Sequence, residues 1–312
     1  MFKFRFALKA IVVLVASMVF TDIAQAQMTQ TFVSAQMGDD SNDCNLAKPC
    51  RTFNHAVNQV NAGGEVTALD SGDYLPFTIS KSVTVQAAPG VYAGITSTVG
   101  PAVVITSGAT GGVVVLRGLT LNGLGGNLGI SSQHQVTLQV ENCVINGFSN
   151  IGIIFLGGQL FVKDTVVRNS GSHGINLTSA SFKITASIDH CQLEKNSLTG
   201  LFVAINGSET MKVTVRDTLS AGNGVGFNLL TSPSGTPAEL NLENCVATNN
   251  GEGIHSERIG AIVRVSNSTI TNNSIIGLLG TAGGSLISRG NNTVEGNGNA
   301  NNGNFTGSFT AK

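Results

Sequence analysis

The stretch VENCVINGFSNIGI at residues 140–153 recurs in altered form five more times along the chain. The later copies are VKDTVVRNSGSHGI (162–175), IDHCQLEKNSLTGL (188–201), VRDTLSAGNGVGF (215–227), LENCVATNNGEGI (242–254) and VSNSTITNNSIIGL (265–278). Every copy begins with an aliphatic residue, a polar residue and then Asn, Asp or His. Every copy ends with Gly followed by an aliphatic residue or Phe. This repetition between Val136 and Ile287 indicates an array of structurally equivalent units.

Three residue positions recur at a spacing typical of a solenoid. The polar position is occupied in turn by Gly118, Asn142, Asp164, His190, Asp217, Asn244, Asn267 and Gly290, which are 22–27 residues apart. A glycine before the final aliphatic residue recurs at Gly129, Gly152, Gly174, Gly200, Gly226, Gly253 and Gly277. Asn recurs between these two series at Asn146, Asn169, Asn196, Asn223, Asn250 and Asn273. Periods of roughly 20–50 residues indicate solenoids, and these copies lack the spaced leucines and helical segment of leucine-rich repeats.

Three short strands and three turns fit within each copy, which predicts an all-β solenoid of parallel strands. Coils stacked about 4.8 Å apart align equivalent side chains, and aligned Asn side chains hydrogen-bond from coil to coil. Strand alternation then predicts which side chains fill the interior: Val140, Ile145, Ile153, Val167, Ile175, Leu193, Leu201, Phe227, Ile254 and Ile270.

The first 26 residues have the features of a signal peptide. A basic start precedes an apolar run (Ala10–Phe20) and a small-residue cleavage pattern (Ala24–Ala26). The apolar run is short for a membrane span, and no later stretch approaches the necessary length. We therefore expect an exported protein, periplasmic or secreted, without a membrane span.

A single amphipathic helix is expected at Thr52–Asn61, where Phe53, Ala56, Val57 and Val60 form one apolar stripe. Such a helix would cover the open end of the strands that follow. The mature chain then divides into a strand, loop and capping helix (27–64), the solenoid (65–295) and a Gly/Asn-rich tail (296–312).

The five cysteines fall into two groups. Cys44 and Cys50 are close in sequence, and in an oxidising compartment we expect them to form a disulfide. A zinc site is the weaker alternative, because two thiols with nearby Asp residues are a poor ligand set. Cys143, Cys191 and Cys245 each follow the polar position of a repeat, so we expect buried free thiols on alternate coils.

The overall charge limits the choice of partner. The net charge is -1, and the 17 basic residues are scattered singly along the chain. Nucleic-acid binding needs clustered Lys and Arg, so no nucleic-acid partner is expected. The sequence also predicts no cofactor, and it leaves the oligomeric state open.

The repeats resemble those of right-handed parallel β-helix proteins, the pectin-lyase-like superfamily. The segment FVSAQMGDDSNDCNLAKPCRTFNHAV (32–57) is similar to the N-terminal cap of secreted bacterial members. The resemblance covers roughly residues 31–300 and implies a single-stranded right-handed β-helix with a capping helix. It implies no single activity, because the superfamily contains lyases, hydrolases, epimerases and adhesins.

In enzymes of this superfamily, chemistry usually lies on the outer face of the strand that begins at the Gly-aliphatic position. Alternation predicts a first outward column of Ser131, Ile154, Asn176, Phe202, Asn228, His255 and Leu279. It predicts a second of Gln133, Leu156, Thr178, Ala204, Leu230 and Glu257. From these columns we expect a binding face of Ile154, Leu156, Asn176, Phe202, Asn228 and Leu230. Alternatively, long turns such as Thr231–Pro237 cover these side chains and keep them from solvent.

Catalytic candidates are few. His255, Glu257 and Arg258, with Glu252 one turn earlier, could bind or deprotonate an acidic sugar. A polar surface patch is the simpler interpretation of the same residues. Asp164, Asp189 and Asp217 would suit a hydrolase, but Asp164 and Asp217 occupy the repeated turn position, which favours a structural role.

Metal chemistry is not expected. No outward column carries enough carboxylates for a calcium site. Calcium in the loop that contains Asp39, Asp40 and Asp43 is an open alternative to their role as turn formers.

Two functions are therefore considered. The first is a non-catalytic binding or surface module that presents a flat face to a glycan or a surface protein. The second is a polysaccharide lyase, epimerase or hydrolase without a recognisable motif. The lack of a carboxylate cluster or a basic groove favours the first.

Overall fold

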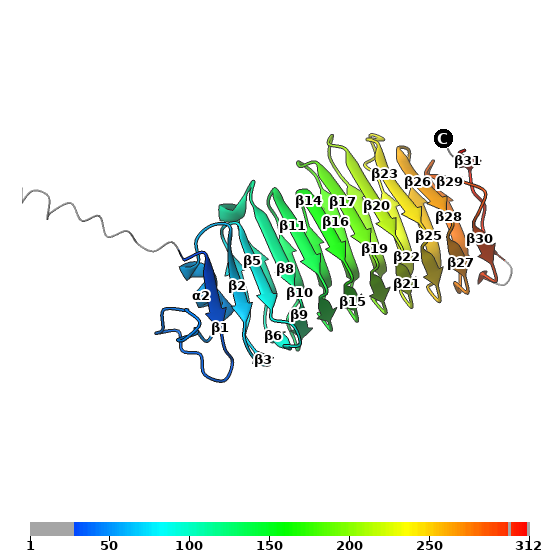
Figure 1. Cartoon of the computed structure of the whole chain (residues 1–312). Helices are drawn as coiled ribbons and strands as arrows, with labels where there is room; N and C mark the ends of the chain where they lie inside the picture. The colour runs from blue at the N-terminus through cyan, green and yellow to red at the C-terminus, as the bar shows by residue number, and fades with distance from the viewer. Residues whose placement is uncertain (1–27, 299–300, 311–312) are drawn as a thin grey trace, which may run out of the picture.

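The computed structural model describes residues 28–298 and 301–310 of the chain. Its strands form three sheets that run along one elongated solenoid (Figure 1). The chain passes from the twelve-stranded sheet to the ten-stranded sheet, then to the nine-stranded sheet, and each such circuit is one coil. Neighbouring strands in every sheet are parallel and come from successive coils. The predicted all-β parallel solenoid is confirmed.

The elements have the following bounds. The twelve-stranded sheet contains β1 (Gln30–Val33), β2 (Gly64–Ala68), β5 (Val83–Ala87), β8 (Val113–Arg117), β11 (Val136–Glu141), β14 (Gly158–Lys163), β17 (Ile184–Asp189), β20 (Met211–Arg216), β23 (Ala238–Glu243), β26 (Ala261–Ser266), β29 (Ser285–Ser288) and β31 (Gly307–Ser308). The ten-stranded sheet contains β3 (Gly72–Asp73), β6 (Ala93–Ser97), β9 (Leu119–Gly123), β12 (Val144–Asn146), β15 (Val166–Arg168), β18 (Gln192–Glu194), β21 (Leu219–Ala221), β24 (Val246–Thr248), β27 (Thr269–Thr271) and β30 (Thr293–Glu295). The nine-stranded sheet contains β4 (Phe77–Ile79), β7 (Pro101–Ile105), β10 (Leu128–Ser132), β13 (Ile151–Phe155), β16 (His173–Ser179), β19 (Thr199–Ile205), β22 (Val225–Leu230), β25 (Glu252–Glu257) and β28 (Ile276–Thr281). The helices are α2 (Phe53–Gln59) and the 3-10 helix η1 (Ser107–Ala109).

The polar position of each repeat lies at the corner where the chain leaves the twelve-stranded sheet for the ten-stranded sheet. All eight residues in this series have a positive φ, from 47° at Asn267 to 93° at Gly290. Gly tolerates the left-handed region freely, and Asn, Asp and His enter it more readily than most other residues. The residue types in this series are therefore explained by the left-handed backbone conformation of the corner.

Buried Asn side chains form a ladder at the corner between the ten-stranded and nine-stranded sheets. Its members are Asn196, Asn223, Asn250, Asn273 and Asn297. From Asn196 onward the predicted Asn series forms this buried ladder, whereas its first two members form a separate exposed pair in which Asn169 Nδ2 donates to Asn146 Oδ1 at 2.7 Å. Asn146 lies within β12, and Asn169 is an exposed residue with a φ of 56°. Ser170 takes the ladder position instead, and its backbone N–H donates to Asn196 Oδ1 at 3.1 Å.

The interior is filled as the strand alternation predicts. Every side chain expected to point inward is at most 1% exposed, namely Val140, Ile145, Ile153, Val167, Ile175, Leu193, Leu201, Phe227, Ile254 and Ile270. Burial of Val, Leu, Ile and Phe side chains stabilises a fold by about 1.5–3 kcal/mol for each residue. The core of stacked aliphatic columns is thus the main source of stability.

The three free cysteines are buried on alternate coils, as expected. Hydroxyl residues fill the same position on the coil that follows each cysteine: Thr165, Thr218 and Ser268. Each hydroxyl accepts a hydrogen bond from the backbone N–H of the cysteine in the preceding coil, for example from Cys143 to Thr165 at 3.3 Å. Burial raises the pKa of Cys143 and Cys245 to about 12 and that of Cys191 to about 11.

The N-terminal end of the solenoid is covered by α2, which contacts β1 and β4 (Figure 1). The helix is shorter than the expected Thr52–Asn61 because Thr52 is its N-cap, and Thr52 Oγ1 accepts a hydrogen bond from His55 N at 3.1 Å. The Phe53 ring lies 4.9 Å from the Tyr74 ring and 5.2 Å from the Phe77 ring.

A disulfide joins Cys44 to Cys50, as predicted, and the loop that it closes is tied to β1. Cys50 N donates to Phe32 O at 2.9 Å, and Ser34 N donates to Cys50 O at 2.9 Å. The signal peptide expected at residues 1–26 lies outside the described residues. Among those that the structure describes, no helix is long and apolar enough to cross a membrane.

The C-terminal segment covers the opposite end. Asn297 is fully buried and is the last member of the Asn ladder. Further along, Phe305 packs against the core, and β31 pairs with β29. Asn297 and Phe305 therefore extend the buried interior beyond residue 295, at which the sequence predicts that the solenoid ends.

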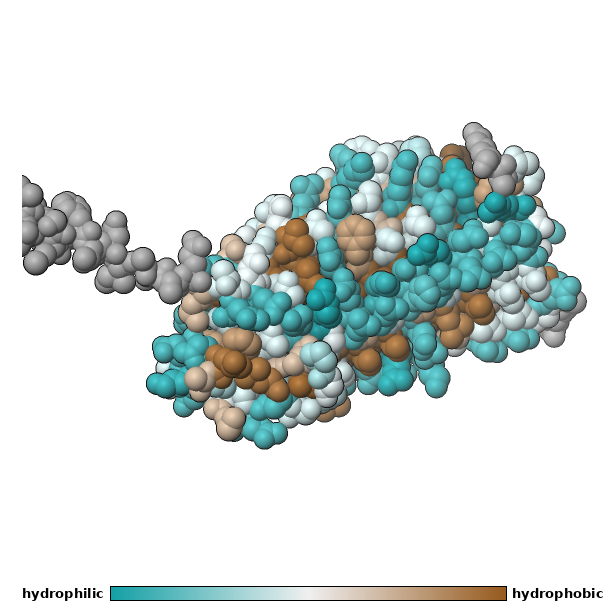
Figure 2. Space-filling view, viewed as in Figure 1, coloured by the Kyte–Doolittle hydropathy of each residue, from teal (hydrophilic) through white to brown (hydrophobic). Residues whose placement is uncertain are grey.

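Opposite charges alternate across the outer face of the twelve-stranded sheet. The strand registers align, in order, Arg117, Glu141, Lys163, Asp189, Arg216 and Glu243. Arg117 Nε lies 2.8 Å from Glu141 Oε2, and Arg216 Nη2 lies 3.1 Å from Asp189 Oδ2. Figure 2 shows hydrophilic residues gathered in a band along the length of the solenoid. Cross-strand pairs of opposite charge favour one register over its alternatives.

Candidate functional site

The outer face of the nine-stranded sheet carries the columns predicted from sequence. Strand pairing aligns the first column as Ser131, Ile154, Asn176, Phe202, Asn228, His255 and Leu279. The second column is aligned from Thr178 through Ala204 and Leu230 to Glu257. Because both columns are continuous, neighbouring side chains within each are one coil apart.

This outer face is only partly open to solvent. Ile154, Leu156, Phe202 and Leu230 are half-buried, and Asn176 and Asn228 are each 9% exposed. The turn Thr231–Pro237 begins with two buried residues, so it borders the face at Leu230. The structure thus brings the predicted binding residues together on one face, in a shallow and partly covered surface.

Phe202 is the aromatic centre of this face. Its ring stacks on the His173 ring, with centroids 4.6 Å apart and planes inclined by 11°. His173 is the first residue of β16 and pairs with Thr199 of β19, so it approaches Phe202 from the preceding coil. Burial of the imidazole lowers the pKa of His173, and its Nδ1 atom is buried without a hydrogen-bond partner among the described residues. The sequence pattern did not connect His173 with Phe202.

Two amide side chains flank Phe202 in the same column. Asn176 Oδ1 accepts a hydrogen bond from Thr178 Oγ1 at 2.5 Å. Asn228 Oδ1, by contrast, is buried and has no hydrogen-bond partner within the described part of the chain. An unpaired buried acceptor is costly to a fold, and the fold leaves this one beside Phe202 in the first column.

Glu252, His255 and Thr281 meet at the C-terminal end of the face. His255 Nδ1 lies 3.1 Å from Glu252 Oε2, and His255 Nε2 lies 2.9 Å from Thr281 Oγ1. Glu252 and His255 project from β25, whereas Thr281 ends the neighbouring strand β28. The side chains of His255 and Glu252 are 15% and 20% exposed. The imidazole is therefore hydrogen-bonded to the Thr281 hydroxyl and in contact with the Glu252 carboxylate, whose Oε2 is buried without a hydrogen-bond partner among the described residues.

The other two catalytic candidates have different environments. Glu257 shares the outer face of β25 with His255, and its Oε1 lies 4.0 Å from Arg258 Nε. Arg258 has a φ of 77°, and its Nη1 donates to Thr231 O at 3.2 Å. The guanidinium thus supports the adjacent turn, and sequence reasoning missed Thr281 as the closer partner of His255.

The three Asp candidates lie away from this face. Asp164 and Asp217 occupy the left-handed corner beside the twelve-stranded sheet, and Asp189 ends β17. Hydrogen bonds from Arg216 lower the pKa of Asp189, and His190 Nδ1 lies 3.1 Å from its carboxylate. Asp189, His190 and Asp217 come within 4.8 Å of one another, but Arg216 already pairs with both carboxylates.

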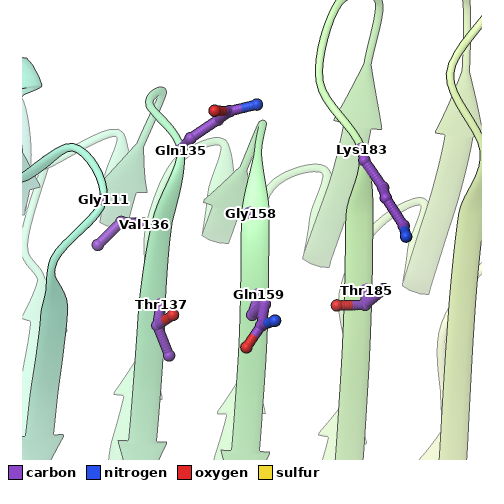
Figure 3. Close-up of a pocket in the computed structure, with 8 residues that line it drawn as sticks. All are labelled: Gly111, Gln135, Val136, Thr137, Gly158, Gln159, Lys183 and Thr185. Carbon is purple, nitrogen blue, oxygen red and sulfur yellow. The ribbon is translucent and has the colours of Figure 1, made fainter.

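A shallow groove on the twelve-stranded sheet was not anticipated. Its polar lining comes from β11, β14, β17 and the residues that precede them: Gln135, Thr137, Gln159, Lys183 and Thr185 (Figure 3). The groove holds one cation and four neutral polar side chains, without a carboxylate or a thiol. Its residues are outward members of successive repeats, which is the sequence signal that would have located it.

The chain is similar to known right-handed β-helix proteins. The family model described as "Right handed beta helix region" matches residues 129–299. A pectate lyase structure, Pel9A, superposes with a TM-score of 0.61 at 18% identity, covering 91% of this chain and 78% of its own. A rhamnogalacturonan lyase superposes with a TM-score of 0.53 at 15% identity, covering 78% of this chain and 74% of its own. No curated protein sequence matches the chain.

Proposed function

Since this chain belongs to the right-handed β-helix family and has a pectin-lyase-like fold, we propose that it is an exported protein that binds a polysaccharide along its nine-stranded sheet. The binding residues are Ile154, Leu156, Asn176, Phe202, Asn228 and Leu230. Export is supported by the signal-like sequence of residues 1–26 and by the Cys44–Cys50 disulfide, since disulfides persist in oxidising compartments.

The arrangement around Phe202 carries the proposal. The ring is held by the stack on His173 and lies between Asn176 and Asn228 in one column. An aromatic ring offers an apolar contact for the C–H face of a sugar, and each amide offers both donors and an acceptor for hydroxyl groups. Asn228 Oδ1 has no partner among the described residues, so a hydroxyl donor from a ligand would satisfy it after a small rotation of the side chain.

The choice of ligand class follows from the shape of the face. Equivalent side chains recur once per coil, about 4.8 Å apart, which suits an extended polymer with repeated contacts. The two structural neighbours named above are lyases of pectate and of rhamnogalacturonan. Uronate-containing polysaccharides are accordingly the first ligands to test, followed by neutral ones.

Binding is tested by affinity electrophoresis of the purified protein in gels that contain a single polysaccharide. We expect retardation in at least one gel, and we expect Phe202→Ala and Asn228→Leu to abolish it. Phe161→Ala is the matched control, because Phe161 is an exposed aromatic residue on the twelve-stranded sheet. Equal retardation of the Phe202 and Phe161 variants would contradict the assignment of the face.

The same preparations address the enzymatic alternative. Lyases form unsaturated products that absorb in the ultraviolet, so each polysaccharide is incubated with the protein while the absorbance is followed. We expect no increase in absorbance. A sustained increase that His255→Ala removes would replace the binding function with a lyase.

A further inference from the structure

We propose that Glu252, His255 and Thr281 form a hydrolytic site for acyl esters, with Thr281 as nucleophile and His255 as base. The three side chains lie in the order carboxylate, imidazole, hydroxyl: His255 Nδ1 is 3.1 Å from Glu252 Oε2, and His255 Nε2 is hydrogen-bonded to Thr281 Oγ1 at 2.9 Å. This is the order of groups that activates a hydroxyl nucleophile in enzymes with unrelated folds. Such a relay is recognised by its geometry and not by its place in the sequence.

The fold itself does not require these residues. The strand registers place Val225 and Ile276 at the positions equivalent to Glu252, and Asn228 and Leu279 at those equivalent to His255. The position of Thr281 is occupied by Glu257 and Leu230 in the preceding coils. The position of Glu252 is therefore apolar in both adjacent coils, that of His255 is apolar in one adjacent coil, and that of Thr281 is apolar two coils earlier, so the fold does not depend on this set of three polar side chains.

Two backbone N–H groups directly follow Thr281 in the chain. Thr281 is followed by Ala282 and Gly283, with φ values of 50° and 89°, and Gly284 N donates to Thr281 O at 3.0 Å. This tight turn exposes Ala282 and Gly283, whose N–H groups have no acceptor among the residues described. The amide that follows a nucleophile is a common donor to the oxyanion of a tetrahedral intermediate.

The chemistry balances with water as the co-reactant. Thr281 Oγ1 attacks the ester carbonyl carbon while its proton passes to His255 Nε2. The tetrahedral intermediate then expels the alcohol, which takes that proton, and an acyl-threonine remains. Water loses a proton to Nε2, attacks the acyl carbon and releases the carboxylic acid together with free Thr281. Glu252 is a positioning residue that holds the imidazole and stabilises its cationic form.

The physiological substrate class rests on the proposed polysaccharide-binding function. Asn228 directly precedes His255 in the first column, so the relay lies in line with the binding face. A polymer along that face would bring its substituents to Thr281, which indicates an O-acylated polysaccharide. Hydrolysis of a small ester does not depend on polymer binding, so the two proposals can fail separately.

The test uses p-nitrophenyl acetate and the purified full chain. We expect hydrolysis whose rate rises with pH and levels off once the imidazole is neutral. Thr281→Val and His255→Ala should each lower kcat/KM by roughly 100-fold or more, whereas Thr281→Ser should retain activity. Glu252→Gln should lower kcat and displace the pH profile. Thr271→Val, on the outer side of β27, is the control that should change nothing.

Two results would overturn the inference. One is hydrolysis by Thr281→Val at the wild-type rate, and the other is no hydrolysis by wild-type protein whose thermal unfolding is cooperative. Mass spectrometry of acid-quenched reactions should place the acetyl group on the peptide that contains Thr281. Protein that hydrolyses the ester but is not retarded by any polysaccharide would support this site and contradict the proposed function.

Discussion

Asn250 Oδ1 accepts two hydrogen bonds from Asn223 of the preceding coil, from the backbone N at 2.9 Å and from Nδ2 at 3.1 Å. Asn250 in turn donates from its own N and Nδ2 to Asn273 Oδ1. Each ladder side chain therefore satisfies buried donors in its neighbour while its own donors are satisfied by the next residue. Such chains of buried polar groups are costly to interrupt.

Replacement of a single ladder residue should destabilise the solenoid strongly. Asn250→Ala removes the acceptor of the Asn223 backbone N–H, one of the acceptors of Asn223 Nδ2 and the side-chain donor to Ser220 O. Because each unsatisfied buried group costs about 1–3 kcal/mol, we expect the free energy of unfolding to fall by about 3 kcal/mol in urea titrations. Asn249→Gly is the control, since Asn249 is exposed with a φ of 56°, and it should unfold like the wild type.

The alternating charges on the twelve-stranded sheet predict a salt-dependent effect. Glu141→Lys would place three cations side by side with Arg117 and Lys163. We expect a lower thermal midpoint than for Glu141→Gln at low ionic strength, and a smaller difference as salt screens the repulsion. Differential scanning calorimetry at two salt concentrations measures this. If the thermal midpoint of Glu141→Lys lies below that of Glu141→Gln by the same amount at both salt concentrations, like-charge repulsion is not the cause.

The buried thiols should be unreactive in the folded protein. Their pKa values, raised by burial to about 11–12, leave almost no thiolate at neutral pH. We expect iodoacetamide to modify Cys143, Cys191 and Cys245 only after denaturation, with no modification of Cys44 or Cys50 until a reductant is added. Peptide mapping by mass spectrometry distinguishes the five positions, and rapid native labelling of Cys191 would contradict its burial.

Most of the fold was predictable because its determinants are local and repeated. The corner residue of every coil, such as Asn142 or Asn244, has a left-handed backbone conformation. Few residue types tolerate that conformation, so the same few types recur at this position of the sequence. The alternation of Val140 with Glu141 likewise identifies which side of a strand is buried. The ladder error at Asn169 arose because Asn serves two purposes one residue apart, as a left-handed corner residue and as a buried ladder member.

The site was harder to predict because its partners lie on different coils. His255 and Glu257 were grouped by their closeness in sequence, whereas the nearest hydroxyl, Thr281, is 26 residues further along. The stack of His173 on Phe202 likewise joins adjacent coils. The repeat register predicts the column in which each residue lies. A contact between residues of different columns also depends on side-chain rotamers, which the repeat pattern does not predict.

The final prediction concerns His173 and acid stability. Burial lowers the pKa of His173 in the folded chain from its ordinary value of 6.5, because a charged imidazole is poorly solvated there. The unfolded chain then binds a proton at a higher pH than the folded chain does. Between the two pKa values the unfolded state holds more protons, so the free energy of unfolding increases with pH in that range.

Stability should therefore be lost as the pH falls below about 6.5, and this loss should stop once His173 is protonated in the folded state. His173→Leu removes the effect and is sterically reasonable, because Ile151 and Leu128 occupy the same strand position in earlier coils. We expect urea midpoints of the wild type to decline more steeply between pH 7.5 and pH 5 than those of the variant. Parallel declines would show that the acid sensitivity belongs to other groups, and His55→Leu on α2 provides the matched comparison.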